Sequence, residues 1–209
     1  MKFYLFHSLL LAATALAAPT ASVEKRQFPP FQTDYRGVED GGCTPFTVIF
    51  ARAIGEPGNV GISTGPPFFN ALQQRLPDPL TIQGVSYDPT TQAGITSGAE
   101  FMVRMFEQAA RQCPGTRIVL SGHAHGATVI HRALWMRSDT AADVRAIVTF
   151  GDPQNDRPYP GPFNDRVLAI CHQDDPMCNG GNDPTGLDRT YGMDAPEAAG
   201  FAASRLLGN

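Results

Sequence analysis

The sequence predicts an α/β fold, a single three-layer domain whose mainly parallel central sheet is covered by helices on both faces. Short β-rich runs alternate with amphipathic helical runs along the chain, and this alternation is typical of a parallel sheet. The strand candidate at 144–150 is dominated by apolar residues, as expected of a strand buried on both faces. Residues 27–209, about 183 in number, are enough for one domain with a substantial core.

Each element is predicted from the spacing of its apolar residues and from the turn residues that bound it. β-branched and aromatic residues mark strands, whereas apolar residues about four apart, such as Phe101, Met105 and Ala109, mark helices. The predicted strands are 46–53, 80–87, 116–120, 144–150 and 166–171, and the predicted helices are 66–76, 95–112, 128–137 and 195–207.

The first 26 residues are predicted to be removed from the mature protein. Lys2 precedes an apolar stretch at 3–16, and the small residues around position 17 suit signal-peptide cleavage, so 1–17 is predicted to be a secretory signal peptide. Residues 18–26 form a short pro-segment that ends in a dibasic site. A transmembrane anchor is the alternative, but the apolar stretch is shorter than the roughly 20 residues that span a bilayer. We therefore expect a secreted, extracellular protein.

The charge balance argues against two classes of partner. The full chain has 16 basic and 20 acidic residues; without 1–26 it has 13 and 19, a net charge of −6. Nucleic acids and anionic membranes attract basic surfaces, so neither is an expected partner.

All four cysteines lie in the predicted mature chain, where the oxidising compartment favours disulfides. Three pairings are possible. Cys171 and Cys178 could enclose a six-residue loop, which would leave Cys43 to pair with Cys113. A zinc site is the alternative, but the sequence has no Cys-x-x-Cys and no histidine at ligand spacing.

The chain is organised around a Gly-x-Ala-x-Gly pattern, in which Gly122 and Gly126 flank Ala124 between a predicted strand and a predicted helix. The pattern matches the nucleophile elbow of α/β-hydrolases, where small neighbours allow a sharp turn around a central serine. Ala124 has no oxygen with which to attack a substrate. An ordinary strand-to-helix turn is the alternative interpretation.

Further motifs make the chain resemble the fungal cutinases, which are small secreted serine esterases with an α/β-hydrolase fold. The motifs are Cys43, Ala-Arg-x-x-x-Glu at 51–56, Gly-Asn-Val-Gly at 58–61, Cys113, the elbow, Phe-Gly-Asp-Pro at 150–153, and Cys171-x-x-x-Asp175-x-x-Cys178. The resemblance implies the disulfides Cys43–Cys113 and Cys171–Cys178 and places Asp175 at the family's catalytic acid. It also implies hydrolysis of cutin or smaller esters. We expect a monomer without a cofactor or metal.

The sequence departs from the family pattern at the positions that carry the chemistry. Ala124 replaces the nucleophile, and Asp188 stands where the family has its catalytic histidine. Ile54 replaces the hydroxyl residue of the oxyanion hole, so only the backbone N–H groups of Ile54 and His125 remain there. The loop at 179–190, which is apolar in cutinases, is polar here.

Other groups could take over the lost chemistry. Asp175 and Asp188 could act as an acid/base pair in which one pKa is raised, or they could hold a divalent ion together with His125. We favour a third interpretation, in which these are solvated polar residues without chemistry. His123 is predicted to fill the core, and His131 and His172 are predicted to have structural partners.

Two functions therefore remain. The first is a catalytically degenerate family member, a pseudoenzyme, that binds a ligand, a polymer surface such as cutin, or a host protein. The second is a carboxylic ester hydrolase that acts on cutin or short-chain esters by an altered mechanism. In both cases the default pocket is the elbow crevice beside Phe68, Phe69 and Leu187.

Overall fold

The computed structural model describes residues 28–29, 32–178 and 188–208. The predicted signal peptide (1–17) and pro-segment (18–26) lie outside these residues. Most of the polar loop, 179–187 with Leu187, also lies outside them.

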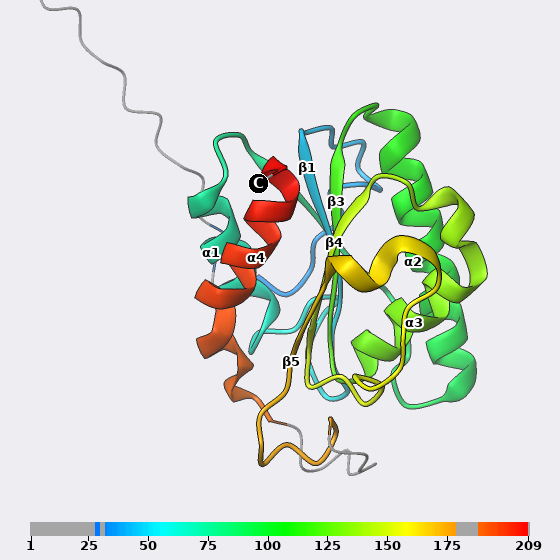
Figure 1. Cartoon of the computed structure of the whole chain (residues 1–209), viewed down its shortest axis with the longest axis vertical. Helices are drawn as coiled ribbons and strands as arrows, with labels where there is room; N and C mark the ends of the chain where they lie inside the picture. The colour runs from blue at the N-terminus through cyan, green and yellow to red at the C-terminus, as the bar shows by residue number, and fades with distance from the viewer. Residues whose placement is uncertain (1–27, 30–31, 179–187, 209) are drawn as a thin grey trace, which may run out of the picture.

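In the described part of the chain, five parallel strands form one sheet with the order β2-β1-β3-β4-β5 (Figure 1). The central position of β3 brings its carboxyl end, where the Gly-x-Ala-x-Gly pattern begins, between the ends of β1 and β4. The strands are β1 (Phe46–Ala51), β2 (Leu80–Gly84), β3 (Arg117–His123), β4 (Val144–Phe150) and β5 (Val167–Ile170).

Among the described residues, four α-helices cover the sheet, two on each face (Figure 1). On one face lie α1 (Gly65–Arg75) and α4 (Ala195–Leu207), and on the other lie α2 (Gln92–Gln112) and α3 (His125–Arg137). The described residues also form three short 3₁₀ segments that the sequence did not predict: η1 (Ser138–Thr140) between α3 and β4, η2 (Gly161–Arg166) between β4 and β5, and η3 (Thr190–Asp194) before α4. The three layers confirm the predicted fold class.

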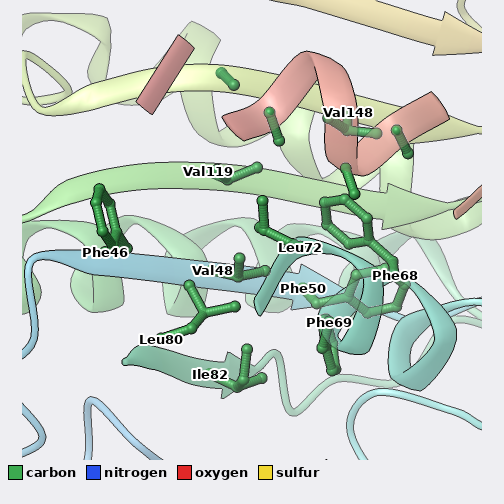
Figure 2. Packing of buried hydrophobic residues seen from close by; sticks show 14 of the residues in the cluster. Phe46, Val48, Phe50, Phe68, Phe69, Leu72, Leu80, Ile82, Val119 and Val148 are labelled. Atoms are coloured by element: carbon green, nitrogen blue, oxygen red, sulfur yellow. The ribbon is translucent and has the colours of Figure 1, made fainter. Parts of the chain in front are cut away.

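The sheet separates two apolar clusters. Alternate side chains of β1 point to opposite faces, so Val48 and Phe50 contact the α1/α4 side while Ile49 contacts the α2/α3 side. Figure 2 shows the first cluster, in which Phe69 of α1 packs on Phe50 and Phe68 packs on Phe69. The core thus holds the carboxyl ends of the strands rigidly.

Two element boundaries differ from their predictions for identifiable reasons. The first strand ends at Ala51 instead of residue 53, because the Arg52 side chain bonds the carbonyl of Gly58 at 2.5 Å as the chain turns away. The second helix starts at Gln92 instead of residue 95. Thr91 caps it by accepting a hydrogen bond from the Gly94 N–H at 2.9 Å.

Both disulfides that the resemblance implied are present: Cys43–Cys113 and Cys171–Cys178. The first joins the segment before β1 to the end of α2, and the second closes the loop that carries Asp175. No cysteine is left free.

Candidate functional site

A strained turn connects β3 to α3. Ala124 has φ +49° and ψ −110°, and it is the one non-glycine residue with positive φ in the described part of the chain. Its N–H donates to the carbonyl of Phe150 at 2.8 Å, which anchors the turn to β4. Such a backbone conformation persists only when its surroundings impose it. The structure therefore has the geometry of a nucleophile elbow around an alanine.

The two glycines of the pattern are required by close backbone packing. A Cβ on Gly126 would lie 1.9 Å from the carbonyl oxygen of Ala51, and one on Gly122 would lie 2.5 Å from the carbonyl group of Gly126. Neither clash can be relieved without moving the backbone of β1 or α3. The same two positions that suggested the elbow in the sequence thus allow α3 to approach the sheet.

The methyl group of Ala124 lies in an apolar contact with Ala53 and Met177. Ala124 and Ala53 have no exposed surface, and Met177 is almost fully buried. The nearest hydroxyl along the sequence is that of Ser121, which is buried in β3 without a hydrogen-bond partner among the described residues. Nothing at this position can attack a carbonyl carbon.

The two predicted oxyanion-hole positions, Ile54 and His125, retain backbone N–H groups that make no hydrogen bond to the described residues. His125 is the first residue of α3, where N–H groups have no partner within the helix. Its side chain adds little polarity, because Nδ1 is buried without a partner and burial lowers the pKa of the ring. These N–H groups could bind a carbonyl oxygen, but within the described residues no side chain that could act as a general base is hydrogen-bonded next to them.

Asp175 is buried, and its carboxylate accepts hydrogen bonds from Met177 and Tyr191. The Met177 N–H donates to Oδ1 at 2.9 Å, and the Tyr191 hydroxyl donates to Oδ2 at 2.7 Å. Burial and the bond to Asp175 raise the pKa of Tyr191, so the phenol stays a donor. The carboxylate is therefore held in place by a phenol.

Asp188 is bonded to His172, a pairing that the sequence did not predict. The Asp188 carboxylate contacts Nδ1 of His172 at 2.5 Å, and the Asp194 carboxylate contacts Nε2 at 2.8 Å. The ring also stacks on Tyr191, with centroids 4.1 Å apart. The bonds to Asp188 and Asp194 raise the pKa of His172, although burial opposes them. Carboxylates engage both ring nitrogens, so the surroundings of His172 favour its protonated form and give it a structural role.

His123 lies at the centre of a buried polar chain. Its Nε2–H donates to the Asp188 carbonyl at 3.0 Å, and Nδ1 is 3.1 Å from the Thr64 hydroxyl. Thr64 is 3.3 Å from Ser63, which donates to Glu56 at 2.7 Å. Burial lowers the pKa of His123 to about 4, so the ring is neutral at pH 7 and Thr64 donates to Nδ1. The predicted core role of His123 is confirmed, and the chain of bonds ties α1 to the elbow.

The candidate residues meet only in part. Asp175 accepts a hydrogen bond from Met177, which contacts Ala124. The carbonyl of Asp188 accepts one from His123, the residue before Ala124. Their carboxylates bond Tyr191 and His172 respectively, so they do not form a shared acid/base pair. The described residues contain no group of three or more His, Cys, Asp or Glu side chains placed to hold a metal ion.

The prediction that Phe68 and Phe69 line a crevice beside the elbow is wrong. Phe68 and Phe69 have no exposed surface, because the first turn of α1 directs both rings into the core (Figure 2). Leu187, the third expected residue, lies outside the described residues.

Three contributors to the site were not predicted: Met177 over Ala124, Tyr191 on Asp175, and Asp194 on His172. The only sequence signals were the position of Met177 inside the disulfide loop and the Tyr-Gly pair at 191–192. Side-chain contacts between distant residues have no local signature in a sequence, so neither signal assigned a partner.

The buried neutral ring of His123 predicts a loss of stability in acid. His123 takes up a proton near pH 6.5 in the unfolded chain but only near pH 4 in the folded protein. The contribution of the neutral ring to the free energy of unfolding is therefore full above pH 6.5 and is lost as the pH falls towards 4. This pKa difference corresponds to about 3 kcal/mol. His123→Phe, which keeps an aromatic ring against Tyr191, should flatten that fall in urea unfolding measured between pH 7 and pH 4.

His172→Gln provides the control with the opposite sign. The pKa of His172 is raised in the folded state, so its contribution is full below the unfolded value and is lost as pH rises through the folded one. This variant should lose more stability in acid than in base. An unchanged acid limb in His123→Phe would contradict the assignment.

Comparison with known proteins supports the family that the sequence resembles, the cutinases. The family described as Cutinase matches residues 42–206. A cutinase from Botryotinia fuckeliana is 36% identical over 203 residues, covering 94% of this chain and 93% of that protein. A cutinase from Coprinopsis cinerea is 34% identical, and the match covers 99% of this chain and 100% of that protein.

The solved structures agree in fold. Trichoderma reesei cutinase, in complex with a phosphonate inhibitor, superposes with a TM-score of 0.74 at 32% identity, covering 84% of this chain and 80% of that one. An acetylxylan esterase at 21% identity, with a TM-score of 0.62, shares the fold alone. The α/β-hydrolase fold, the elbow geometry, the two disulfides and these matches together show that the chain belongs to the cutinase family.

Proposed function

We propose that this protein is an extracellular member of the cutinase family that binds ester polymers of the cutin type without hydrolysing them through a serine nucleophile. The single observation that carries this proposal is the methyl group of Ala124, which occupies the elbow and is covered by Ala53 and Met177. A serine esterase requires a hydroxyl at that point and an imidazole to take its proton.

The surroundings of Ala124 support the loss of that chemistry. Position 188, where the resemblance expects the general base, carries a carboxylate whose pKa is lowered. Burial alone would raise it, but hydrogen bonds from Thr190 and His172 outweigh burial. Of the nearby histidines, His172 has both nitrogens bonded to carboxylates, and His123 donates from Nε2 to a carbonyl. Neither bond leaves a base directed at residue 124.

Family membership favours a second candidate, hydrolysis of carboxylic esters. The relatives compared above are named cutinases, and one of them was solved with a phosphonate inhibitor. An active enzyme without a serine at position 124 would need an altered mechanism. The free N–H groups of Ile54 and His125 could then polarise the ester while a water molecule attacks it.

Two exposed apolar side chains support binding to a polymer surface. Gly192 packs so closely on the carbonyl of Ser63 that a Cβ there would lie 2.4 Å from the oxygen. Ile62 and Met193 flank this contact, and they are 43% and 80% exposed.

Within the described residues, no helix has the length and apolar character needed to cross a membrane. The sequence of 1–26, interpreted as a signal peptide with a pro-segment, supports an extracellular location for the mature protein.

Fluorophosphonate probes are expected not to label the protein. They react with activated serines, and the described site has none: Ser121 is buried, and Ser63 donates to Glu56. Intact-mass spectrometry after incubation would check this, together with turnover of a short-chain p-nitrophenyl ester. Stoichiometric serine labelling would overturn the non-hydrolytic proposal and support the second candidate.

Binding is tested separately by depletion of the protein from solution onto cutin particles. Ile62→Ser combined with Met193→Ser should reduce the bound fraction. Leu207→Ser is the matched control, because Leu207 is 38% exposed at the end of α4. Equal binding by both variants would contradict a surface contact at Ile62 and Met193.

A further inference from the structure

A second hollow lies away from the elbow, between α3 and the turn that follows β4. Its volume is about 230 Å³, and it is lined by Thr128, His131, Arg132, Trp135, Gln154 and Arg157. His131 lies seven residues after Ala124, about 10 Å along the helix at 1.5 Å per residue. The hollow therefore does not depend on the function proposed for the elbow.

One wall of this hollow is fixed by a buried acid. Asp152 accepts a hydrogen bond from Nε2 of His131 at 3.0 Å and another from the Gln154 N–H at 2.8 Å. The ring of Tyr159 stacks on His131 with centroids 4.0 Å apart, and its hydroxyl lies 3.4 Å from Asp152. His131 and Asp152 are 3% and 1% exposed. This arrangement locks the turn to α3 and pre-organises the wall.

The same wall leaves one ring nitrogen available. Because a carboxylate only accepts, Nε2 of His131 is the donor to Asp152. The remaining nitrogen, Nδ1, makes no hydrogen bond to the described residues, and His131 lines the hollow. A buried polar ring with an unused nitrogen at a cavity wall indicates a place for a polar ligand.

The hollow also has an unpaired cation. Arg157 is exposed, and its guanidinium makes no ion pair or hydrogen bond within the described part of the chain. The other guanidinium, that of Arg132, is held by Gln92 and Thr96 of α2. None of the six lining residues is acidic. Two acids, Asp152 and Asp156, line a neighbouring hollow of about 310 Å³ that Arg157 also lines.

Trp135 adds a flat apolar surface. It is the one tryptophan of the chain, it is 66% exposed, and its indole makes no ring contact or hydrogen bond to the described residues. Tryptophan is enriched at interfaces, because its ring combines a large apolar area with an N–H donor. Beside Arg157 it can carry the ring of a ligand.

We infer that this hollow is a second binding site, and that it takes a small ligand in which a carboxylate is carried on a ring. The guanidinium of Arg157 matches a carboxylate through two parallel N–H donors. The ring of the ligand lies on Trp135, and the Thr128 hydroxyl, the Gln154 amide and the free nitrogen of His131 serve its remaining polar groups. The volume suits a single ring with its acid group.

Tryptophan fluorescence reports directly on this site, because Trp135 is the sole tryptophan. The intact mature protein is titrated with benzoate and galacturonate as acids, and with benzamide and galactose as their neutral counterparts. The acids should change the emission saturably, whereas the neutral compounds should not. Binding of benzoate alone would assign an aromatic acid, and binding of galacturonate alone would assign a sugar acid.

Arg157→Gln should weaken binding of the acid at least about tenfold, because a hydrogen bond to a charged group is lost. Arg145→Gln is the matched control, since Arg145 is also exposed and lies on β4 outside the hollow. The inference is overturned if Arg157→Gln binds like the control, or if the neutral compounds bind as tightly as the acids. It is also overturned if no probe changes the emission and equilibrium dialysis with the same probes detects no binding.

Discussion

Ala124→Ser combined with Asp188→His is expected to create hydrolysis of a short-chain p-nitrophenyl ester, whereas Ala124→Ser alone is expected to create almost none. A serine hydroxyl stays protonated and weakly nucleophilic unless a base takes its proton. A positioned general base contributes about two to four orders of magnitude in rate, so the double variant should exceed the single one by that factor. Initial rates at pH 8 measure the difference.

The geometry of the site favours this result. The turn at Ala124 already has the strained conformation of an elbow, and the change to serine adds one oxygen. The Asp188 carbonyl bonds His123, so position 188 lies beside the elbow. Asp175 is held nearby by Met177 and can orient an imidazole. The rate should stay below that of a competent cutinase, because each missing oxyanion donor costs about 3 to 4 kcal/mol and Ile54 supplies no hydroxyl.

Two controls separate a rebuilt triad from other causes. Ala124→Ser with Asp188→Asn removes the carboxylate at 188 without adding a base, and it should be as inactive as Ala124→Ser alone. Adding Asp175→Asn to the active double variant should remove most of the new activity. Full activity in Ala124→Ser alone would mean that an existing base, His125 or His172 first, reaches residue 124, and the non-hydrolytic proposal would be dropped.

The fold was largely predictable because its signals are local. The β-rich run at 144–150 became β4 without any change of bounds, and the closing helix became α4 in the same way. The errors lie where tertiary contacts end an element. The second strand was predicted to reach residue 87 but ends at Gly84, where the Asn59 amide packs so closely that a Cβ would lie 2.0 Å from its oxygen. A contact across 25 residues is not visible in the pattern of one strand.

The candidate site was predictable in its positions but not in its bonds. The family resemblance predicted that Ala124, Asp175 and Asp188 lie near one another, and the structure brings them to the same end of the sheet. Spacing could not show that Asp188 would bond a histidine 16 residues earlier. It also could not show that Met177 would cover Ala124, because which side chain covers a site depends on packing between loops.

Removal of the Cys43–Cys113 disulfide is expected to cost about 4 kcal/mol of unfolding free energy, and removal of Cys171–Cys178 about 2 to 3 kcal/mol. The two cysteines are 70 residues apart in the first bridge and 7 residues apart in the second. A bridge that closes a longer loop restricts the unfolded chain more. Paired Cys→Ser variants, measured by urea unfolding at pH 7, give the two costs. Thiol titration of the denatured, unreduced protein should find no reactive thiol.

The order of the two costs decides which physical effect dominates. If unfolded-chain entropy dominates, the Cys43→Ser/Cys113→Ser variant is the less stable one, although its bridge is far from the elbow. The short bridge has a local role instead, because it closes the loop that positions Asp175 and Met177. A larger cost for the short bridge would show that packing of this loop over Ala124 outweighs chain entropy. In that case the Cys171→Ser/Cys178→Ser variant should also expose Ala124, and the rescue by Ala124→Ser with Asp188→His should fail in its background.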